Sequence, residues 1–424
     1  MSYFLSLKRP TTYSISAIIM PLLKNIGHLA TCRDTGNQSD IHPITNAVIV
    51  WKDDTIEWVG KEGELPDEYA NLKEFDAEGK MVIPGLVDCH THLAFGGWRP
   101  EEFTMRVKGE SYLDIAKSGG GILSTVKATR EASEDELYDK ARGFLKEMSG
   151  LGVTTVECKS GYGLSLEHEL KTLRVYRRLA EDQPMHIIPT FLGAHTIPPE
   201  YKDDRQGYID LVIEEMIPAV AEENLAEFCD IFTEESAFTI PESRQILTAA
   251  KAAGLTPKLH ADQLTSCGGA ELAAEVEAAS ADHLEKISDK GIEQMAKAGV
   301  VGVTLPLASL YTQEEPLNCR KLVERGVQVA VATDFNPGSA PSYDLPLAMM
   351  LACNQGRLSP SEVLKGATIY AAKAIHRDYK IGSIEKGKSA DFAIIDAPHP
   401  DFWMYHYKGA NCIKSFIRGK KNNF

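Results

Sequence analysis

Apolar and polar positions alternate along the chain with two different periods. From about residue 83 to residue 380, short apolar runs alternate with longer segments, such as 134–151, 166–181 and 288–298, whose apolar residues recur at helical spacing. Short buried strands that alternate with helices are typical of parallel βα units. Eight such strands over about 250 residues predict a (β/α)8 TIM barrel, whose active site lies at the C-terminal strand ends. The predicted strands are 86–90, 153–159, 186–193, 226–233, 256–262, 279–284, 300–306 and 327–334.

Both ends of the chain show a different pattern, in which short strands are separated by turn-forming residues. Near the N-terminus, residues 47–51 and 55–60 are predicted to form a hairpin that turns at 53–54. Near the C-terminus, residues 390–396 and 412–418 have the same character. Neither end could bury much apolar surface alone, so we expect both ends to build one smaller β-sandwich beside the barrel, in a chain of the α/β class. The predicted domains are an irregular extension at 1–21, a composite β-sandwich domain at 22–82 and 381–424, and a (β/α)8 catalytic domain at 83–380.

The composition restricts the classes of partner and compartment. Hydrophobic residues make up 43% of the chain, which is enough for a large core. The formal net charge of -15 argues against a nucleic acid or an anionic membrane as partner, and no apolar run is as long as a membrane span. The eight cysteines are scattered without a CxxC pair, which favours reduced thiols and a cytoplasmic protein. Residues before Met20 weakly resemble a targeting segment, and a chain start at Met20 fits as well, so both interpretations stay open.

Five polar side chains fall at the ends of predicted strands, where barrel enzymes place their catalytic groups. His90 and His92 end the first strand, His260 the fifth, His283 the sixth and Asp334 the eighth. Because alternate strand residues share a face, His90 and His92 can reach one ion. Three imidazoles and one carboxylate suit one divalent zinc or one iron ion, and the residue types do not decide between the two metals. The predicted metal ligands are His90, His92, His260 and Asp334.

Such an ion would give this rim hydrolytic chemistry. It lowers the pKa of bound water to about 7, so that a metal hydroxide is available at neutral pH. Asp334 could carry a proton from that water to a leaving group, and His283 could polarise a carbonyl or stabilise an oxyanion. Among the other histidines, His195, just past the third strand, is kept as a site residue. The alternative is a barrel with incidental rim histidines, and ligand residues at the appropriate strand ends argue against it.

Several segments resemble known enzymes. Residues 84–92, Pro-Gly-Leu-Val-Asp-Cys-His-Thr-His, resemble the strand-one signature of the amidohydrolase superfamily. Residues 382–395 resemble the C-terminal segment in which chains of that superfamily pass from the barrel back into the β-domain. More narrowly, the chain is similar to the imidazolonepropionase family from about residue 22 to residue 420. The segments that carry this narrower resemblance are 95–99, 118–122, 157–164, 191–195, 258–263 and 333–339.

The resemblance implies a small-molecule substrate and a set of site residues. It implies that the cyclic amide of 4-imidazolone-5-propanoate is opened to N-formimidoyl-L-glutamate, the third step of histidine degradation, with Asp334, His283 and Gln263 in catalytic roles. Arg99 is implied as the partner of the substrate carboxylate; without the resemblance, a surface arginine paired with Glu101 or Glu102 is the simpler interpretation. A homodimer is expected by analogy. The implied substrate-binding residues are Arg99, Tyr112, Tyr162, His195, Gln263, Asn336, Gly338 and Ser339.

Three other classes remain as alternatives. A zinc deaminase of a cytosine- or guanine-like base would place a glutamate three residues after His260, where this chain has Gln263, and an amide cannot shuttle the required proton. A binuclear hydrolase would carry a carboxylated lysine at the end of strand four. That strand ends at 231–234 without a lysine, and Lys159 ends strand two, where a salt-bridged rim residue is expected. A non-enzymatic barrel scaffold would be expected to lose metal ligands, and all four are present.

Overall fold

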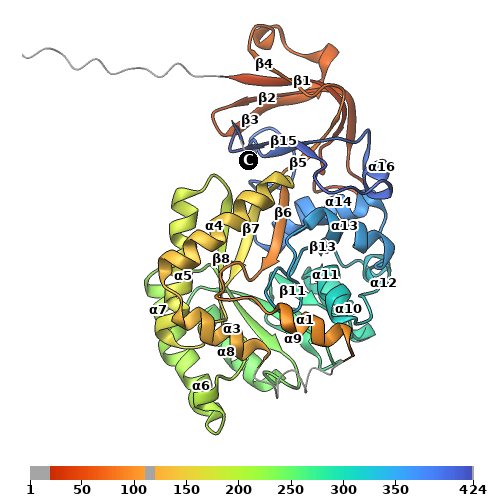
Figure 1. Ribbon diagram of the computed structural model, residues 1–424. Helices are drawn as coiled ribbons and strands as arrows, with labels where there is room; N and C mark the ends of the chain where they lie inside the picture. The colour runs from red at the N-terminus through yellow and green to blue at the C-terminus, as the bar shows by residue number, and fades with distance from the viewer. Residues whose placement is uncertain (1–19, 110–119, 423–424) are drawn as a thin grey trace, which may run out of the picture.

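Eight parallel strands form a barrel at the centre of the molecule (Figure 1). The computed structural model describes residues 20–109 and 120–422, so Tyr112 and nearly all of the predicted N-terminal extension lie outside the described residues. The strands follow one another around the barrel in chain order, each parallel to the next. They are β6 Leu86–Thr91, β7 Val153–Lys159, β8 His186–Ala194, β9 Phe228–Thr233, β10 Thr256–Ala261, β11 Ser280–His283, β12 Val301–Thr304 and β13 Val329–Val331.

The barrel closes between its last strand and its first. The Asp334 N–H donates to the carbonyl of His90 at 3.1 Å, and the His92 N–H donates to the carbonyl of Phe335 at 2.8 Å. These bonds follow directly after β13 and join the segments that carry candidate ligands. The predicted barrel of eight strands is confirmed, and its closure draws Asp334 towards His90 and His92.

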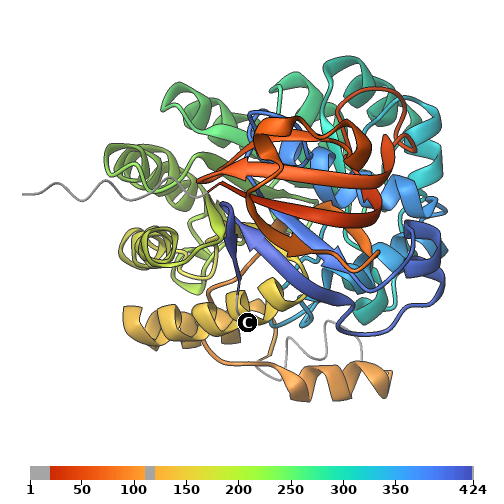
Figure 2. The ribbon, with the colours of Figure 1, turned by 90° about the horizontal axis from the view of Figure 1, so that it is seen from above.

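Helices surround the barrel (Figure 2), and long ones such as α4 and α5 bury an apolar face in the barrel core. The three predicted helical segments are α4 Glu134–Gly150, α5 Leu166–Asp182 and α10 Asp289–Ala298. Helix α4 begins at a capping box, in which the side chains of Ser133 and Glu136 each accept a backbone N–H from the other residue. Among the described residues, the other α-helices are α1 Pro100–Val107, α3 Ile122–Glu131, α6 Arg205–Leu211, α7 Ile217–Glu222, α8 Ile240–Ala252, α9 Gly269–Glu275, α11 Pro306–Thr312, α12 Cys319–Glu324, α13 Leu345–Asn354, α14 Pro360–Lys365, α15 Ala371–Ala374 and α16 Pro400–Tyr405.

A second sheet of eight strands is built from both ends of the chain. Strands β16, β15, β14, β5, β1, β2 and β3 are hydrogen-bonded in that order, and β4 pairs with β1. The ring of Trp51 packs against Phe75 from the N-terminal part and against Phe392 and Phe416 from the C-terminal part, at centroid distances of 5.9, 5.2 and 5.3 Å. Both ends therefore share one core, as predicted, while the division from the barrel at residues 83 and 380 stays a prediction. The strands are β1 Pro21–Ala30, β2 Pro43–Lys52, β3 Thr55–Lys61, β4 Lys73–Asp76, β5 Met81–Pro84, β14 Phe392–Ile395, β15 Cys412–Ile417 and β16 Lys420–Lys421.

The terminal sheet lies at the amino-terminal end of the barrel (Figure 1). Only Gly85 separates β5 from β6, and His186 at the start of β8 pairs with Asp391 at 2.9 Å. The carboxyl ends of the barrel strands therefore open on the opposite side.

All eight cysteines are unpaired. Within residues 20–109 and 120–422, no helix combines the length and the apolar character needed to cross a bilayer.

Candidate active site and metal centre

The four predicted ligands converge at the carboxyl end of the barrel. Oδ1 of Asp334 lies 3.4 Å from Nε2 of His90 and 3.5 Å from Nε2 of His92. The ring centroids of His90 and His260 are 4.6 Å apart, and those of His92 and His260 are 5.5 Å apart. All four side chains are buried. The structure thus brings together every residue that the strand-end pattern places in the metal set.

The donor atoms of this cluster fit a metal ion. Nε2 of His90 and Nε2 of His260 are buried without a hydrogen-bond partner. Each buried polar atom left unpaired costs about 1–3 kcal/mol, so their concentration at one point favours a cation bound among them. The candidate ligand atoms of His90, His92 and Asp334 lie within 4.8 Å of one another, as do those of His90, His260 and His283. Imidazole and carboxylate donors together suit zinc or iron.

Two carboxylates that the sequence analysis did not single out orient the histidines. Oδ2 of Asp282 lies 2.6 Å from Nδ1 of His90, and Oδ2 of Asp230 lies 3.1 Å from Nδ1 of His260. A carboxylate behind a metal-binding histidine fixes its ring and raises its basicity. Both aspartates are fully buried inside barrel strands, Asp282 in β11 and Asp230 in β9. A charged residue inside a buried strand is the signal that could have identified them.

Lys159 links these carboxylates inside the barrel. Its Nζ lies 2.7 Å from Asp230, 2.8 Å from Glu157 and 3.6 Å from Asp282. The expected salt bridge is present, but Lys159 is fully enclosed in the barrel rather than placed at its rim. Burial opposes its charge, yet the surrounding carboxylates raise the pKa of Lys159 above its usual value. The lysine therefore stays cationic and balances part of the acidic charge behind the histidines.

The backbone is left-handed at two of the functional strand ends. The φ angle is +57° at Asp334, +79° at His283 and +72° at Leu284, and such positions cost non-glycine residues about 1–3 kcal/mol.

Burial alone would raise the pKa of the Asp334 carboxyl, but His90 and His92 hold it well below its usual range. Burial lowers the pKa of His283 to about 3. At neutral pH the site therefore presents a carboxylate at 334 and a neutral imidazole at 283.

Arg99 lies at the same end of the barrel, against the turn that follows Asp334. A Cβ built on Gly338 would fall 1.4 Å from Nη2 of Arg99, so the guanidinium covers this glycine. Arg99 also pairs with Glu102 at 3.5 Å, although its Nε is buried without a partner. Arg106 donates to the carbonyl of Gly338 at 2.6 Å. The expected pair with Glu102, in the first turn of α1, is present, but the Arg99 side chain is only 12% exposed and is not a simple surface residue.

The loop that carries Arg99 is fixed from helix α4. Nζ of Lys140 donates to the carbonyls of Phe95 at 3.1 Å and Gly97 at 2.7 Å, and it lies 3.9 Å from the centroid of the Phe95 ring. Gly97 has a φ of +68°, which a residue with a side chain rarely adopts. The path of the chain from Phe95 to Arg99 is therefore set before a ligand arrives.

Tyr162 and His195 line the same site. The ring centroid of Tyr162 lies 5.7 Å from that of His92, and the ring of His195 stacks on His92 at 5.1 Å with an interplanar angle of 16°. Nδ1 of His195 lies 3.0 Å from the carbonyl of Gly161 and must donate to it. Burial lowers the pKa of His195 well below its usual value. The neutral ring is therefore left with an acceptor at Nε2.

Gln263 follows the end of β10 by two residues and is half-buried. The loop beyond it is held by Glu234, whose Oε2 accepts the N–H groups of Leu264 at 2.8 Å and Thr265 at 3.2 Å. The residue therefore stands on a fixed loop at the predicted end of the barrel. Its contact with a substrate stays a prediction.

Asn336 organises the turn after Asp334. Its Oδ1 accepts the N–H groups of Gly338 and Ser339, each at 2.8 Å, and its Nδ2 donates to the carbonyl of Asp334 at 2.6 Å. The Ser339 hydroxyl lies 3.4 Å from Oδ2 of Asp334. These groups thus hold one another beside the metal cluster, and their contact with a product stays a prediction.

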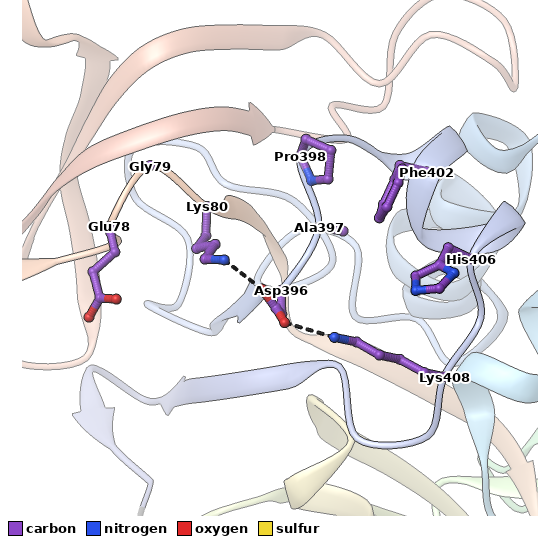
Figure 3. A pocket seen from close by; sticks show the side chains of 9 residues that line it. All are labelled: Glu78, Gly79, Lys80, Asp396, Ala397, Pro398, Phe402, His406 and Lys408. Atoms are coloured by element: carbon purple, nitrogen blue, oxygen red, sulfur yellow. Dashed lines mark hydrogen bonds and ion pairs between the residues drawn. The ribbon is translucent and has the colours of Figure 1, made fainter.

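A groove lies beside the terminal sheet and is lined by none of the residues of the histidine cluster (Figure 3). It has a volume of about 440 Å³. Asp396 pairs there with Lys80 at 2.6 Å and with Lys408 at 2.8 Å. Phe402 of α16 forms part of its lining. None of the predicted site residues lines the groove, and both of its lysines are already paired with Asp396, so the candidate site stays with the histidine cluster.

Comparison with known proteins places the chain in a family. Residues 81–422 match the amidohydrolase family. The imidazolonepropionase of Shouchella clausii (strain KSM-K16) is 51% identical over 387 residues, covering 90% of this chain and 86% of that protein. The imidazolonepropionase of Fusobacterium nucleatum is 48% identical over 406 residues, covering 94% and 98%. The chain belongs to the imidazolonepropionase family of amidohydrolases. Amidohydrolases depend on metal, which agrees with the donor set of this imidazolonepropionase-family chain.

More distant structures share the fold of this imidazolonepropionase-family chain. Atrazine chlorohydrolase TrzN from Arthrobacter aurescens TC1, complexed with zinc, matches with a TM-score of 0.72 at 16% identity over 95% of this chain and 94% of the other. Guanine deaminase of E. coli matches with a TM-score of 0.72 at 15% identity over 95% and 99%. At these identities the likeness shows the fold alone, and it agrees with the predicted barrel. The deaminase and scaffold alternatives are not favoured by the family relatives.

Proposed function

We propose that this chain hydrolyses the cyclic amide C–N bond of 4-imidazolone-5-propanoate to give N-formimidoyl-L-glutamate, the third step of histidine degradation. The observation that carries the proposal is the cluster of His90, His92, His260 and Asp334 with Arg99 at the same end of the barrel. The cluster can hold a hydrolytic metal, and the guanidinium can hold a carboxylate. Membership of the imidazolonepropionase family supports the same reaction.

We assign His90, His92, His260 and Asp334 as the ligands of one zinc or one iron ion per chain. When bound there, the ion would supply Lewis acidity to the attacking water and to the ring carbonyl. The three imidazoles are neutral donors and Asp334 contributes one negative charge, so this set does not cancel the charge of a divalent cation. The carboxylates of Asp282 and Asp230 keep the rings of His90 and His260 aimed at the site.

In this proposal Asp334 moves the proton. As the water oxygen bonds to the ring carbonyl carbon, a carboxylate oxygen of Asp334 accepts a proton from that water. When the ring C–N bond breaks, Asp334 returns the proton to the leaving nitrogen, so protons balance over the cycle. The neutral His283 donates a hydrogen bond to the carbonyl oxygen as negative charge develops there.

Arg99→Ala should raise KM for 4-imidazolone-5-propanoate by about 10–100-fold with a smaller change in kcat, because a charge-assisted hydrogen bond is worth about 1.5–3 kcal/mol. An imidazolone without the propanoate tail should be affected much less. Steady-state kinetics on both compounds test this, and Arg99→Lys is the matched variant that keeps the charge but loses the planar fork. Equal losses on both compounds would remove Arg99 from carboxylate binding.

Gly338→Ala should raise KM on the same substrate, because the added Cβ would fall 1.4 Å from Nη2 of Arg99 and must displace the guanidinium. We expect about a tenfold effect or more, within the range given for losing the arginine contact. Gly143→Ala, on the outside of α4 with no atom within 4 Å of its Cβ, is the control. An unchanged KM in Gly338→Ala would show that the observed position of Arg99 is not the one that binds substrate.

A substrate panel tests the proposed function itself. Initial rates are measured with 4-imidazolone-5-propanoate, guanine, cytosine and hydantoin, with ammonia release recorded in parallel. We expect turnover of the imidazolone alone, with no ammonia released. Ammonia released from a base in the absence of imidazolone hydrolysis would replace the proposal with a deaminase, and opening of hydantoin alone would point to another cyclic amide.

A further inference from the structure

A carboxyl group behind His283 has no role in the mechanism described above. The side chain of Glu285 is 4% exposed, and its Oε2 is buried without a hydrogen-bond partner. Nδ1 of His283 is also buried without a partner, and it lies 3.8 Å from that oxygen. Buried polar atoms are nearly always paired in folded proteins. Two unpaired atoms that face each other at this distance can satisfy one another after a small rotation of either side chain.

The backbone makes this approach specific. His283 and Leu284 are consecutive left-handed residues, with φ angles of +79° and +72°. This rare turn ends β11 and returns the carboxyl of Glu285 to the ring two residues before it. A strained pair of this kind persists only where the surrounding structure holds it, and it is found most often at functional sites.

One oxygen of Glu285 is already fixed by a neighbouring helix. The hydroxyl of Ser309, on α11, donates to Oε1 at 3.3 Å. The other oxygen, Oε2, remains for His283. Burial raises the pKa of Glu285 to about 8, and the nearby Asp334 carboxylate acts in the same direction. The carboxyl group therefore has a proton to donate at neutral pH.

We propose that Glu285 is the positioning residue for His283: its Oε2 hydrogen-bonds Nδ1 and so fixes the ring tautomer in which Nε2 carries the proton and faces the substrate carbonyl. The inference rests on the proposed function, in which His283 donates to the developing oxyanion. In the opposite tautomer, Nε2 would present a lone pair to that oxyanion and repel it. Glu285 would thus select the useful form of a neutral histidine without touching the substrate.

The test reads the tautomer and the kinetics separately. In the zinc-loaded full chain, labelled with ¹⁵N-histidine, the signals of His283 are assigned by their loss in His283→Gln, and their chemical shifts report which nitrogen carries the proton. This readout needs no substrate, so failure of the inference is distinguishable from failure of the proposed function. We expect the Nε2–H tautomer, with Nδ1 accepting a hydrogen bond.

Two variants of Glu285 extend the test. Glu285→Leu removes the partner of Nδ1, and kcat should fall by about 10²-fold with less than about a threefold change in KM, as for the loss of an oxyanion donor. The Nε2–H population should fall in the same variant. Glu285→Gln keeps a donor of the same shape, so it should preserve the tautomer and retain most of the kcat. Thermal unfolding and metal content are recorded for each variant.

Two results would overturn the proposal directly. One is an Nδ1–H tautomer at His283 in the native chain. The other is a folded, metal-loaded Glu285→Leu with the native kcat. If Glu285→Leu does not fold, Glu285→Gln decides the question, because a kcat as low as that of His283→Gln, or a changed tautomer, would show that a neutral donor at this position is not what His283 needs.

Discussion

Asp334→Asn is expected to lower kcat for ring opening by at least about 10³-fold, at the upper end of what a positioned proton carrier contributes. The asparagine amide has nearly the same shape, but it cannot accept a proton from the attacking water. It also brings no negative charge to the cation site formed with His90 and His92. The fold should survive, since barrel closure uses the backbone N–H of residue 334 rather than its side chain.

Kinetics with excess metal separate the two functions of Asp334. If the loss came only from weaker metal binding, excess zinc or iron would restore the rate; the proposed proton transfer predicts that it does not. Asp88→Asn is the matched control, because Asp88 is buried in the same strand as His90 and accepts from the N–H of Thr333 at 3.1 Å and from its hydroxyl at 2.6 Å. That variant should lose stability more than kcat. Full activity in Asp334→Asn would rule out the proposed base.

Lys159→Met should lower the free energy of unfolding by about 3–5 kcal/mol, because it leaves buried carboxylates without their main cation. Asp230, Asp282 and Glu157 all lie within 4 Å of Nζ, and each of these side chains is fully buried. The two aspartates also orient His260 and His90. We therefore expect metal affinity to fall by about 10–100-fold, the usual effect of losing such support.

Denaturant unfolding and metal titration measure both effects of Lys159→Met. Lys258→Met is the matched control, since its Nζ lies 3.9 Å from Asp282 and donates to the hydroxyl of Ser280 at 2.8 Å. Among these carboxylates, Lys258 contacts only Asp282, which lies behind His90, and at a longer distance than Lys159 does. Its loss should therefore reduce metal affinity less than the loss of Lys159. Native metal affinity in Lys159→Met, or equal losses in both variants, would contradict the role assigned to Lys159.

The barrel and its ligand set could be predicted from the sequence because both depend on local patterns. The apolar runs end in His90, His260, His283 and Asp334, and parallel strands bring such ends together at one side of a barrel. The shared core of the two chain ends was also predictable, since neither end has enough apolar surface alone. The sequence did not show which side chains contact one another across the fold.

The contacts of Lys159 that support the ligands join strands that are not neighbours in the barrel. Lys159 on β7 reaches Asp230 on β9 and Asp282 on β11, and no local spacing encodes these distances. The pairing of Glu285 with His283 depends on two left-handed residues that no residue type at 283 or 284 announces. Such contacts need the three-dimensional structure.

The most direct test of the account is reconstitution of activity with metal. The chain is stripped of metal and titrated with zinc or with iron. Loss of the ultraviolet absorbance of fresh 4-imidazolone-5-propanoate is followed, and N-formimidoyl-L-glutamate is identified by mass spectrometry. The account predicts no ring opening without metal, and activity that rises in proportion to bound metal until one ion per chain is reached. Ring opening by the metal-free chain, a requirement for two ions, or a metal-loaded chain that leaves the substrate intact would contradict it.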